Sequence, residues 1–158
     1  MTEIESAWPR YPDYRIDLVP CKGTARVRVA ETVLAESASA IRLIETDHVD
    51  RLYSPESDVR VDLLEDSETR TICPFKGEAS YWSFRKADLP VDDVFWTYRQ
   101  PFEEVAGIKG YLGVYHEKVE VEVETGWADG SKPSSDERTM SSSDWPFLFL
   151  KRLVFCCP

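Results

Sequence analysis

Short stretches in which apolar and polar residues alternate recur at intervals of roughly ten residues, with turn-forming residues between them. An alternation of period two places successive side chains on opposite faces of a β-strand. The predicted strands are residues 25–29, 33–35, 37–46, 51–53, 59–63, 69–73, 79–84, 94–98, 111–115 and 119–124. We therefore predict an all-β fold, a sandwich, barrel or roll, with little helix.

One segment needs a choice between strand and helix, and another is predicted as a helical turn. In residues 37–46, Ile41 and Ile44 fit one face of a helix, whereas Ile41 and Leu43 fit one face of a strand. The segment is short and its neighbours are predicted strands, which favours the strand. Residues 54–58 combine a serine, a proline and acidic residues, a composition typical of a single helical turn.

The last predicted strand carries a row of carboxylates. Val119, Val121 and Val123 alternate with Glu120, Glu122 and Glu124. Alternate residues of a strand lie ~6.6 Å apart, so three such carboxylates cannot share one divalent cation without further ligands. A solvent-exposed face, which also discourages aggregation between sheet edges, is the favoured interpretation.

The chain divides into three parts by composition. Residues 1–24 are predicted to form an N-terminal arm, since residues 8–14 contain two prolines and three aromatic residues without a period. Residues 25–127 hold the predicted strands. Residues 128–158 form a serine-rich linker, predicted to be flexible, and an apolar C-terminal tail. An added strand, a segment that makes protein contacts and a membrane-touching segment all remain open for this tail.

Charge and hydropathy exclude several classes of protein. The chain has 29 acidic and 19 basic side chains, a formal net charge of −10. Binding to nucleic acid or to an anionic membrane needs a basic surface, so neither is expected. No apolar run reaches the ~20 residues of a membrane span, and the first residues lack the features of a signal peptide. We expect a cytoplasmic protein.

A metal site is not expected either. The cysteines are Cys21, Cys73, Cys156 and Cys157, and no pair has the Cys-x-x-Cys spacing of a zinc site. Neither His48 nor His116 stands at a zinc-finger distance from a cysteine. Reduced thiols and no cofactor are the expectation.

The densest polar and aromatic run, Cys-Pro-Phe-Lys-Gly-Glu-Ala at residues 73–79, follows Pro-x-x-Asp-Val-Arg at residues 55–60. With these motifs, residues 21–124 resemble the domain-of-unknown-function 427 family. The resemblance implies a compact β-roll of the β-tent type, with two antiparallel sheets that meet at an angle around a pocket. The family also carries the label of a nucleotidyltransferase-type domain. No Gly-Ser pair followed by Asp-x-Asp, the signature of such enzymes, occurs in this sequence.

The same run predicts a binding pocket. Lys76 lies between a proline and a glycine, so we expect it on a tight, exposed turn where it presents a charge to an anion. Arg60 either faces solvent, pairs with a nearby carboxylate or anchors the same anion. Strand alternation should divide the aromatic residues between the core and the pocket or surface. The predicted ligand-binding residues are Arg60, Lys76, Glu78, Tyr81, Trp82, Trp96 and Tyr98.

Two residues are candidates for catalysis. Cys73 would be a nucleophile if Lys76 and Arg60 lowered the pKa of its thiol, although a buried apolar role is favoured. His116 is the one candidate acid or base near neutral pH, although a surface position is favoured. We therefore expect a small β domain that binds a small anionic ligand in an aromatic pocket. The alternative is an enzyme, nucleotidyltransferase-like or cysteine-dependent, that uses this pocket.

Overall fold

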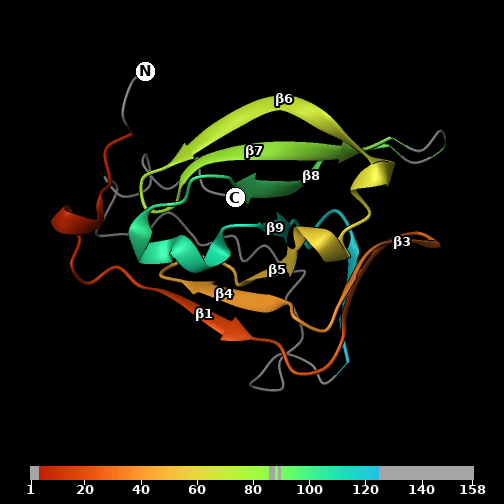
Figure 1. The fold of residues 1–158 in the computed structure, drawn as a ribbon, viewed down its shortest axis with the longest axis horizontal. Coiled ribbons are helices and arrows are strands. Elements are labelled where there is room, and N and C mark those ends of the chain that lie inside the picture. The colour runs from red at the N-terminus through yellow and green to blue at the C-terminus, as the bar shows by residue number, and fades with distance from the viewer. Residues whose placement is uncertain (1–3, 86–87, 89, 125–158) are drawn as a thin grey trace, which may run out of the picture.

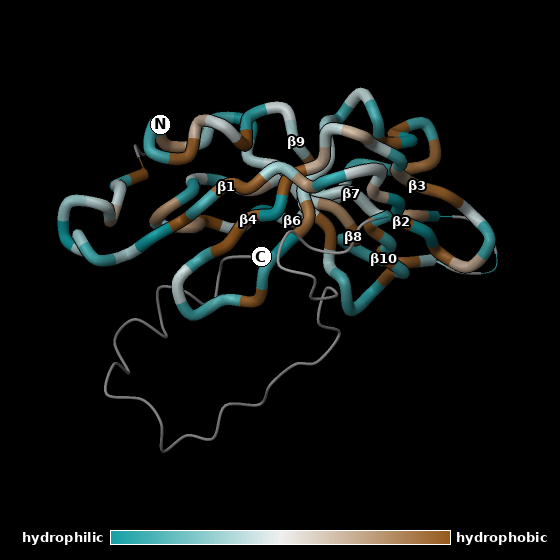
Figure 2. Tube along the Cα trace, turned by 90° about the horizontal axis from the view of Figure 1, so that it is seen from below, coloured by the Kyte–Doolittle hydropathy of each residue, from teal (hydrophilic) through white to brown (hydrophobic). Residues whose placement is uncertain are grey.

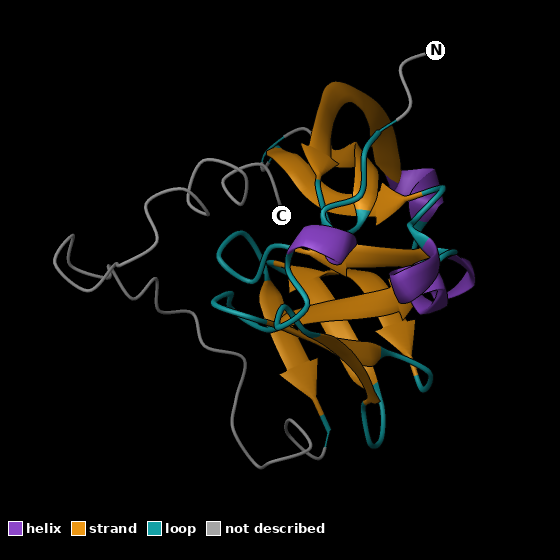
Figure 3. Ribbon diagram, turned by 90° about the vertical axis from the view of Figure 1, so that its left-hand side faces the viewer, coloured by secondary structure: helices purple, strands orange, loops and turns teal. Residues whose placement is uncertain are grey.

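A computed structural model of the protein describes residues 4–85, 88 and 90–124. Strands dominate the fold, and the helical segments are short 3-10 turns (Figure 3). The strands form two antiparallel sheets. These features confirm the predicted all-β class with two sheets and little helix. The linker and tail predicted at residues 128–158 lie outside the described residues.

The larger sheet has seven strands. In spatial order they are β1 (Ile16–Pro20), β4 (Ile41–Glu45), β5 (Arg51–Pro55), β9 (Tyr111–Val114), β8 (Val91–Tyr98), β7 (Gly77–Phe84) and β6 (Leu64–Cys73). Figure 1 shows the sheet with β6 at one margin and β1 at the other. Strand β9 lies between β5 and β8, so it joins two groups of strands that are separate in the sequence.

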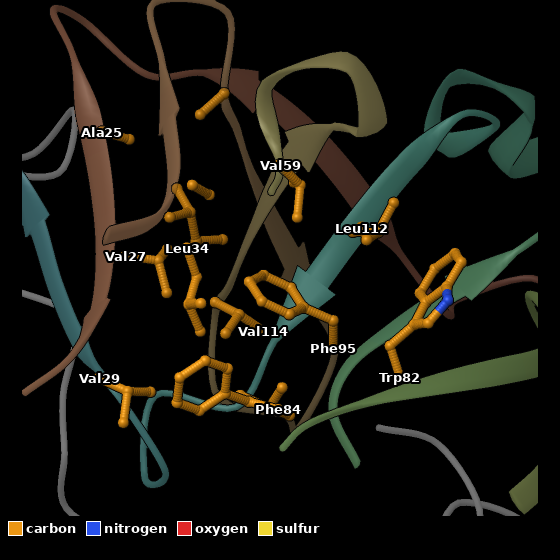
Figure 4. Close-up of a cluster of buried hydrophobic side chains, with 14 residues drawn as sticks. Ala25, Val27, Val29, Leu34, Val59, Trp82, Phe84, Phe95, Leu112 and Val114 are labelled. Atoms are coloured by element: carbon orange, nitrogen blue, oxygen red, sulfur yellow. The ribbon is translucent and has the colours of Figure 1, made fainter. Parts of the chain in front are cut away.

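The smaller sheet has the order β10 (Glu120–Val123), β2 (Ala25–Val29) and β3 (Thr32–Ser37). Its inner face packs against the seven-stranded sheet and forms the first core, in which Val27 and Leu34 project toward Phe95 and Val114 (Figure 4). The alternation seen in the sequence of β2 places its valines in this core. The hydrophobic stretches of the chain lie mainly along such strands, whereas several outer loops are hydrophilic (Figure 2).

The other face of the seven-stranded sheet is also covered. Residues 4–14, the N-terminal arm, and the helical segment η4 (Glu103–Ile108) pack on it and form the second core. This core contains Ala7 and Tyr14 from the arm and Val105 and Ile108 from η4. Because both faces are covered, the five residues from Val94 to Tyr98 of β8 are all buried. Antiparallel sheets more often keep one face in solvent.

The remaining helical turns are η1 (Trp8–Arg10), η2 (Glu56–Asp58) and η3 (Val61–Leu63). Segment η2 confirms the helical turn predicted at residues 54–58. Residues 37–46 contain the end of β3 and the whole of β4, which confirms the choice of strand. Among the described residues, no helix is long and apolar enough to cross a membrane.

Two local predictions were wrong. Residues 59–63 do not form a strand: Val59 makes an isolated bridge to Ala35, and η3 follows. The backbone N–H of Leu63 instead bonds the Arg60 carbonyl at 3.0 Å, which closes a turn. Strand β1 was missed and lies within the segment predicted as the arm, so the arm ends before Ile16.

Gly113 of β9 accommodates the largest side chain of the second core. It stands directly opposite Trp96 on β8 and Tyr53 on β5. The indole lies over Gly113, and its Nε1 donates a hydrogen bond to the Tyr53 hydroxyl at 2.9 Å. A Cβ atom at Gly113 would come within 2.4 Å of the Trp96 ring.

We predict that Gly113→Ala lowers the free energy of unfolding by about 1–3 kcal/mol, because the buried indole has no room to move aside. Gly107→Ala is the matched control, since its Cβ would meet only the flexible end of Leu18, at 2.8 Å. Urea unfolding of the two variants gives the comparison. Equal losses in the two variants would show that the Trp96 contact does not control the stability.

Candidate functional site

The turn between β6 and β7 is buried, which contradicts the exposed position predicted for Lys76. The side chains of Phe75 and Lys76 are 1% and 0% exposed. Three carbonyls of the turn accept hydrogen bonds from other parts of the chain: Pro74 from Ala7 N–H at 2.9 Å, Phe75 from the Trp8 indole N–H at 2.8 Å and Lys76 from Phe102 N–H at 3.1 Å. Packing by the arm and by the segment before η4 thus encloses a turn that local sequence places at the surface.

Lys76 pairs with Glu45 in the interior. Its Nζ lies 2.5 Å from Oε2 of Glu45, the last residue of β4, and both side chains are almost completely buried. The other carboxylate oxygen of Glu45 accepts a hydrogen bond from the Tyr14 hydroxyl. Two buried charges and a phenol therefore satisfy one another, as buried charges must.

Burial dominates the electrostatics of this group. Loss of water lowers the pKa of Lys76, although the Glu45 carboxylate acts in the opposite direction. Burial, and then the charge of Glu45, raise the pKa of Tyr14, so its hydroxyl stays protonated and acts as a donor. The Glu45 carboxylate thus offsets part of the cost of burying the Lys76 ammonium group.

Aromatic residues surround the ion pair. The Nζ of Lys76 lies 5.8 Å from the centre of the Tyr98 ring, and burial raises the pKa of Tyr98 well above its usual range. The Tyr98 hydroxyl is buried and has no hydrogen-bond partner in the part of the chain that the structure describes. The same holds for Nε2 of His48, whose pKa is lowered by burial. We call Lys76, Glu45, Tyr14, Tyr98 and His48 the Lys76–Glu45 site.

The structure brings some of the predicted site residues together. Tyr81, Trp96 and Tyr98 line the second core, whereas Trp82 points into the first. Strand alternation places Tyr81 and Trp82 in different cores, but neither residue reaches the surface, because both faces of the sheet are covered.

Two predicted ligand-binding residues lie elsewhere. Glu78 is exposed on β7. Arg60 pairs with Asp62 at 2.7 Å in solvent, which corresponds to one of the alternatives predicted for it.

The catalytic candidates gain no support. The Cys73 side chain is fully buried, and its sulfur belongs to a disulfide, so it offers no thiolate. This disulfide contradicts the expected reduced state, whereas Cys21 is a free thiol. His116 is buried rather than exposed, and its Nε2 accepts a hydrogen bond from the Leu52 N–H at 3.2 Å. Burial, followed by the charge of Arg51, lowers its pKa to about 4, so it is neutral at pH 7.

Glu45, Tyr14 and His48 were not predicted as site residues. For Glu45 a signal exists, because it follows Leu43 by two residues and therefore shares the inward face of β4. An inward carboxylate requires a buried cation. Tyr14 has no such signal, since it lies in a segment without a period.

The acidic row of β10 faces outward, as favoured from the sequence, and meets arginines of β2. Glu120 stands opposite Arg28 and Glu122 opposite Arg26. Arg28 forms ion pairs with Glu120 and Glu122, at 3.6 and 3.1 Å. Arg26 forms ion pairs with Glu122, at 3.7 Å, and with Glu36 of β3, at 2.7 Å. A groove of about 530 Å³ lies over this sheet. No group of three or more His, Cys, Asp or Glu side chains within residues 4–85, 88 and 90–124 is arranged to hold a metal ion.

We predict that Lys76→Met lowers the free energy of unfolding by about 3–5 kcal/mol, because it leaves the Glu45 carboxylate buried without its counter-charge. The double variant Lys76→Met/Glu45→Leu should recover part of that loss, since it removes both charges. Urea unfolding is the measurement, with Arg60→Ala, at an exposed ion pair, as a control that leaves the midpoint unchanged. A double variant less stable than Lys76→Met would contradict the coupling.

His116 should make stability depend on pH. The unfolded chain takes up a proton near the ordinary pKa of 6.5, whereas the folded chain does so near 4. The stabilisation from neutral His116 is therefore complete above pH 6.5 and is lost as the pH falls toward 4. Between pH 7.5 and 4.5 the wild type should lose about 2–3 kcal/mol more than His116→Gln, measured by urea unfolding. Parallel pH profiles of the two proteins would refute this.

The family can be assigned from a comparison with known proteins. Among the curated proteins no match was found. A family model described as a domain of unknown function, DUF427, matches residues 17–125, which include every strand after β1, most of β1 itself and all of the Lys76–Glu45 site except Tyr14. Since this match covers more than half of the chain, the protein belongs to the DUF427 family.

Proposed function

We propose that the chain is a binding module for a small ligand that presents a carboxylate or another oxygen acceptor to the Lys76–Glu45 site. The observation that carries the proposal is the Tyr98 hydroxyl, which is buried and has no hydrogen-bond partner among the described residues. A buried polar group without a partner costs about 1–3 kcal/mol, so it calls for an explanation. A bound ligand supplies one.

The groups around Tyr98 favour a ligand that accepts hydrogen bonds. Both oxygens of Glu45 already accept, one from Tyr14 and one from Lys76. An ammonium group has three N–H donors, and one of those on Lys76 bonds Glu45. The capacity that remains on Lys76 is therefore donor capacity, and the Tyr98 hydroxyl can donate as well. An anionic oxygen forms the strongest hydrogen bonds with such donors.

The alternative, an enzyme that uses the same pocket, has less support. Cys73 lacks a free thiolate, and His116 bonds the backbone of β5. Lys76 and Arg60 were both expected to hold the anion. Only Lys76 belongs to the site, because Arg60 is exposed and paired with Asp62. Binding therefore remains the better supported function, with Tyr98 in the place expected for Arg60.

The test is a titration with acetate, benzoate and inorganic phosphate, with sodium chloride at matched ionic strength as the reference. At least one of the three anions should bind saturably, as measured by calorimetry and by a rise in melting temperature. Tyr98→Phe removes only the hydroxyl and should weaken that binding at least tenfold. Glu78→Gln, an exposed change on β7, should leave it unchanged.

Two results would overturn the proposal. One is the absence of saturable binding for all three anions. The other is equal binding by the wild type and Tyr98→Phe, which would place the ligand elsewhere on the protein.

A further inference from the structure

The Lys76–Glu45 site is closed in this structure, and part of its cover is the N-terminal arm. Lys76 is fully buried and Glu45 is 5% exposed. Tyr14, at the end of the arm, lies over the pair and donates its hydroxyl hydrogen to Glu45. We propose that the arm is a displaceable strap, and that Tyr14 fills a subsite for a planar ring that carries an N–H or O–H donor.

The contacts of Tyr14 define the subsite. Its ring stacks on Phe75 with centroids 3.6 Å apart and planes inclined by 5°, while its hydroxyl reaches the Glu45 carboxylate. The ring face of Phe75 and the Glu45 carboxylate thus recognise a flat ring and a hydrogen-bond donor at once. In this structure Tyr14 of the arm supplies both the ring and the donor.

Few polar contacts hold the arm to the rest of the domain. In the described part of the chain, a single backbone hydrogen bond, from Ala7 N–H to the Pro74 carbonyl, joins residues 4–14 to the rest. The Trp8 indole adds a bond to Phe75, and Trp8 and Tyr11 meet the Phe75 ring edge-on at 5.4 and 5.8 Å. The other backbone bonds of the arm are local to it. Its release therefore breaks no strand pairing, as expected of a segment that opens independently.

The boundary of the family match separates the strap from what it covers. Glu45, Phe75, Lys76 and Tyr98 all lie within the matched residues 17–125, whereas Tyr14 and the arm precede them. The binding groups therefore belong to the family domain, and the strap is a separate segment placed on it. A ligand of the domain competes with Tyr14 for the same surface.

The inference rests on the proposed function for the other end of the ligand. The donor of the ring would bond Glu45, as Tyr14 does, and an acceptor oxygen would face Lys76 and Tyr98. The ligand class is thus a small aromatic compound with a donor at one end and an oxygen acceptor at the other. Each end has its own test, because acetate and phosphate lack a ring and p-cresol lacks a carboxylate.

The probe is p-cresol, which reproduces the side chain of tyrosine, and toluene is the control that lacks the hydroxyl. Binding is measured by calorimetry on the full chain. The wild type should bind p-cresol, and Tyr14→Ala should bind it at least tenfold more tightly, because no side chain competes for the subsite. Toluene should bind Tyr14→Ala at least tenfold more weakly than p-cresol does. Tyr14→Phe keeps the ring in place, so it provides a folded variant with an intermediate affinity.

Release of the strap has a separate readout. Exchange of the Ala7 amide and of the Trp8 indole N–H, followed by NMR, should accelerate when the wild type is saturated with p-cresol. Unchanged exchange at saturation would overturn the proposal, because the ligand would then bind without moving the arm. Failure of the wild type to bind p-cresol up to its solubility limit would overturn it as well. If these tests fail while the anions still bind through Tyr98, the strap is refuted and the proposed function stands.

Discussion

One buried ion pair constrains most of this domain. Glu45 ends the second strand of the larger sheet, and Lys76 immediately precedes the sixth, yet their charged atoms lie 2.5 Å apart. Strands so far apart in a flat sheet could not meet, so the sheet must curve until the end of β4 reaches the turn before β7. Two features enclose this pair. Gly77 has a positive φ (113°) in the turn between β6 and β7, and the arm packs over that turn. A charge left without its partner here would destabilise the whole arrangement.

The strands that have one wet face were predictable from the sequence. Val27 and Val29, with Arg26 and Arg28 between them, show an alternation that the structure reproduces as buried and partly exposed positions. The strands covered on both faces were harder to interpret, because their consecutive residues are all buried and do not alternate between apolar and polar. Trp96 and Thr97 of β8 are an example, since they are buried on opposite faces of the sheet. The run from Val59 to Leu63 alternates as well, but Val61 is 40% exposed in a 3-10 turn. An alternation over five residues does not by itself distinguish a strand from a turn.

Of the Lys76–Glu45 site, the sequence pointed only to Lys76 and Tyr98, and it placed Lys76 on an exposed turn. Tyr98 has the same strand parity as Trp96 on β8, and both lie in the second core. The location of Lys76 depends on Glu45 and on the arm, which are 31 residues or more away in the sequence. Local reasoning places a Pro-Phe-Lys-Gly turn at the surface, because turns usually lie there. The one signal was the position of Glu45 on the inward face of β4, which indicates that a cation is buried beside it. That signal does not identify which residue supplies the cation.

The position of β9 has a consequence for how the chain assembles. Strands β1, β4 and β5 form one group and β6, β7 and β8 a meander, and β9 is the strand that pairs with both. It is also the last of the seven to leave the ribosome. Until β9 has left the ribosome and paired, each group presents an open edge at β5 or β8, where unpaired backbone groups invite association with other chains. Late, non-local closure of this kind slows folding, and both edges stay open for that longer time.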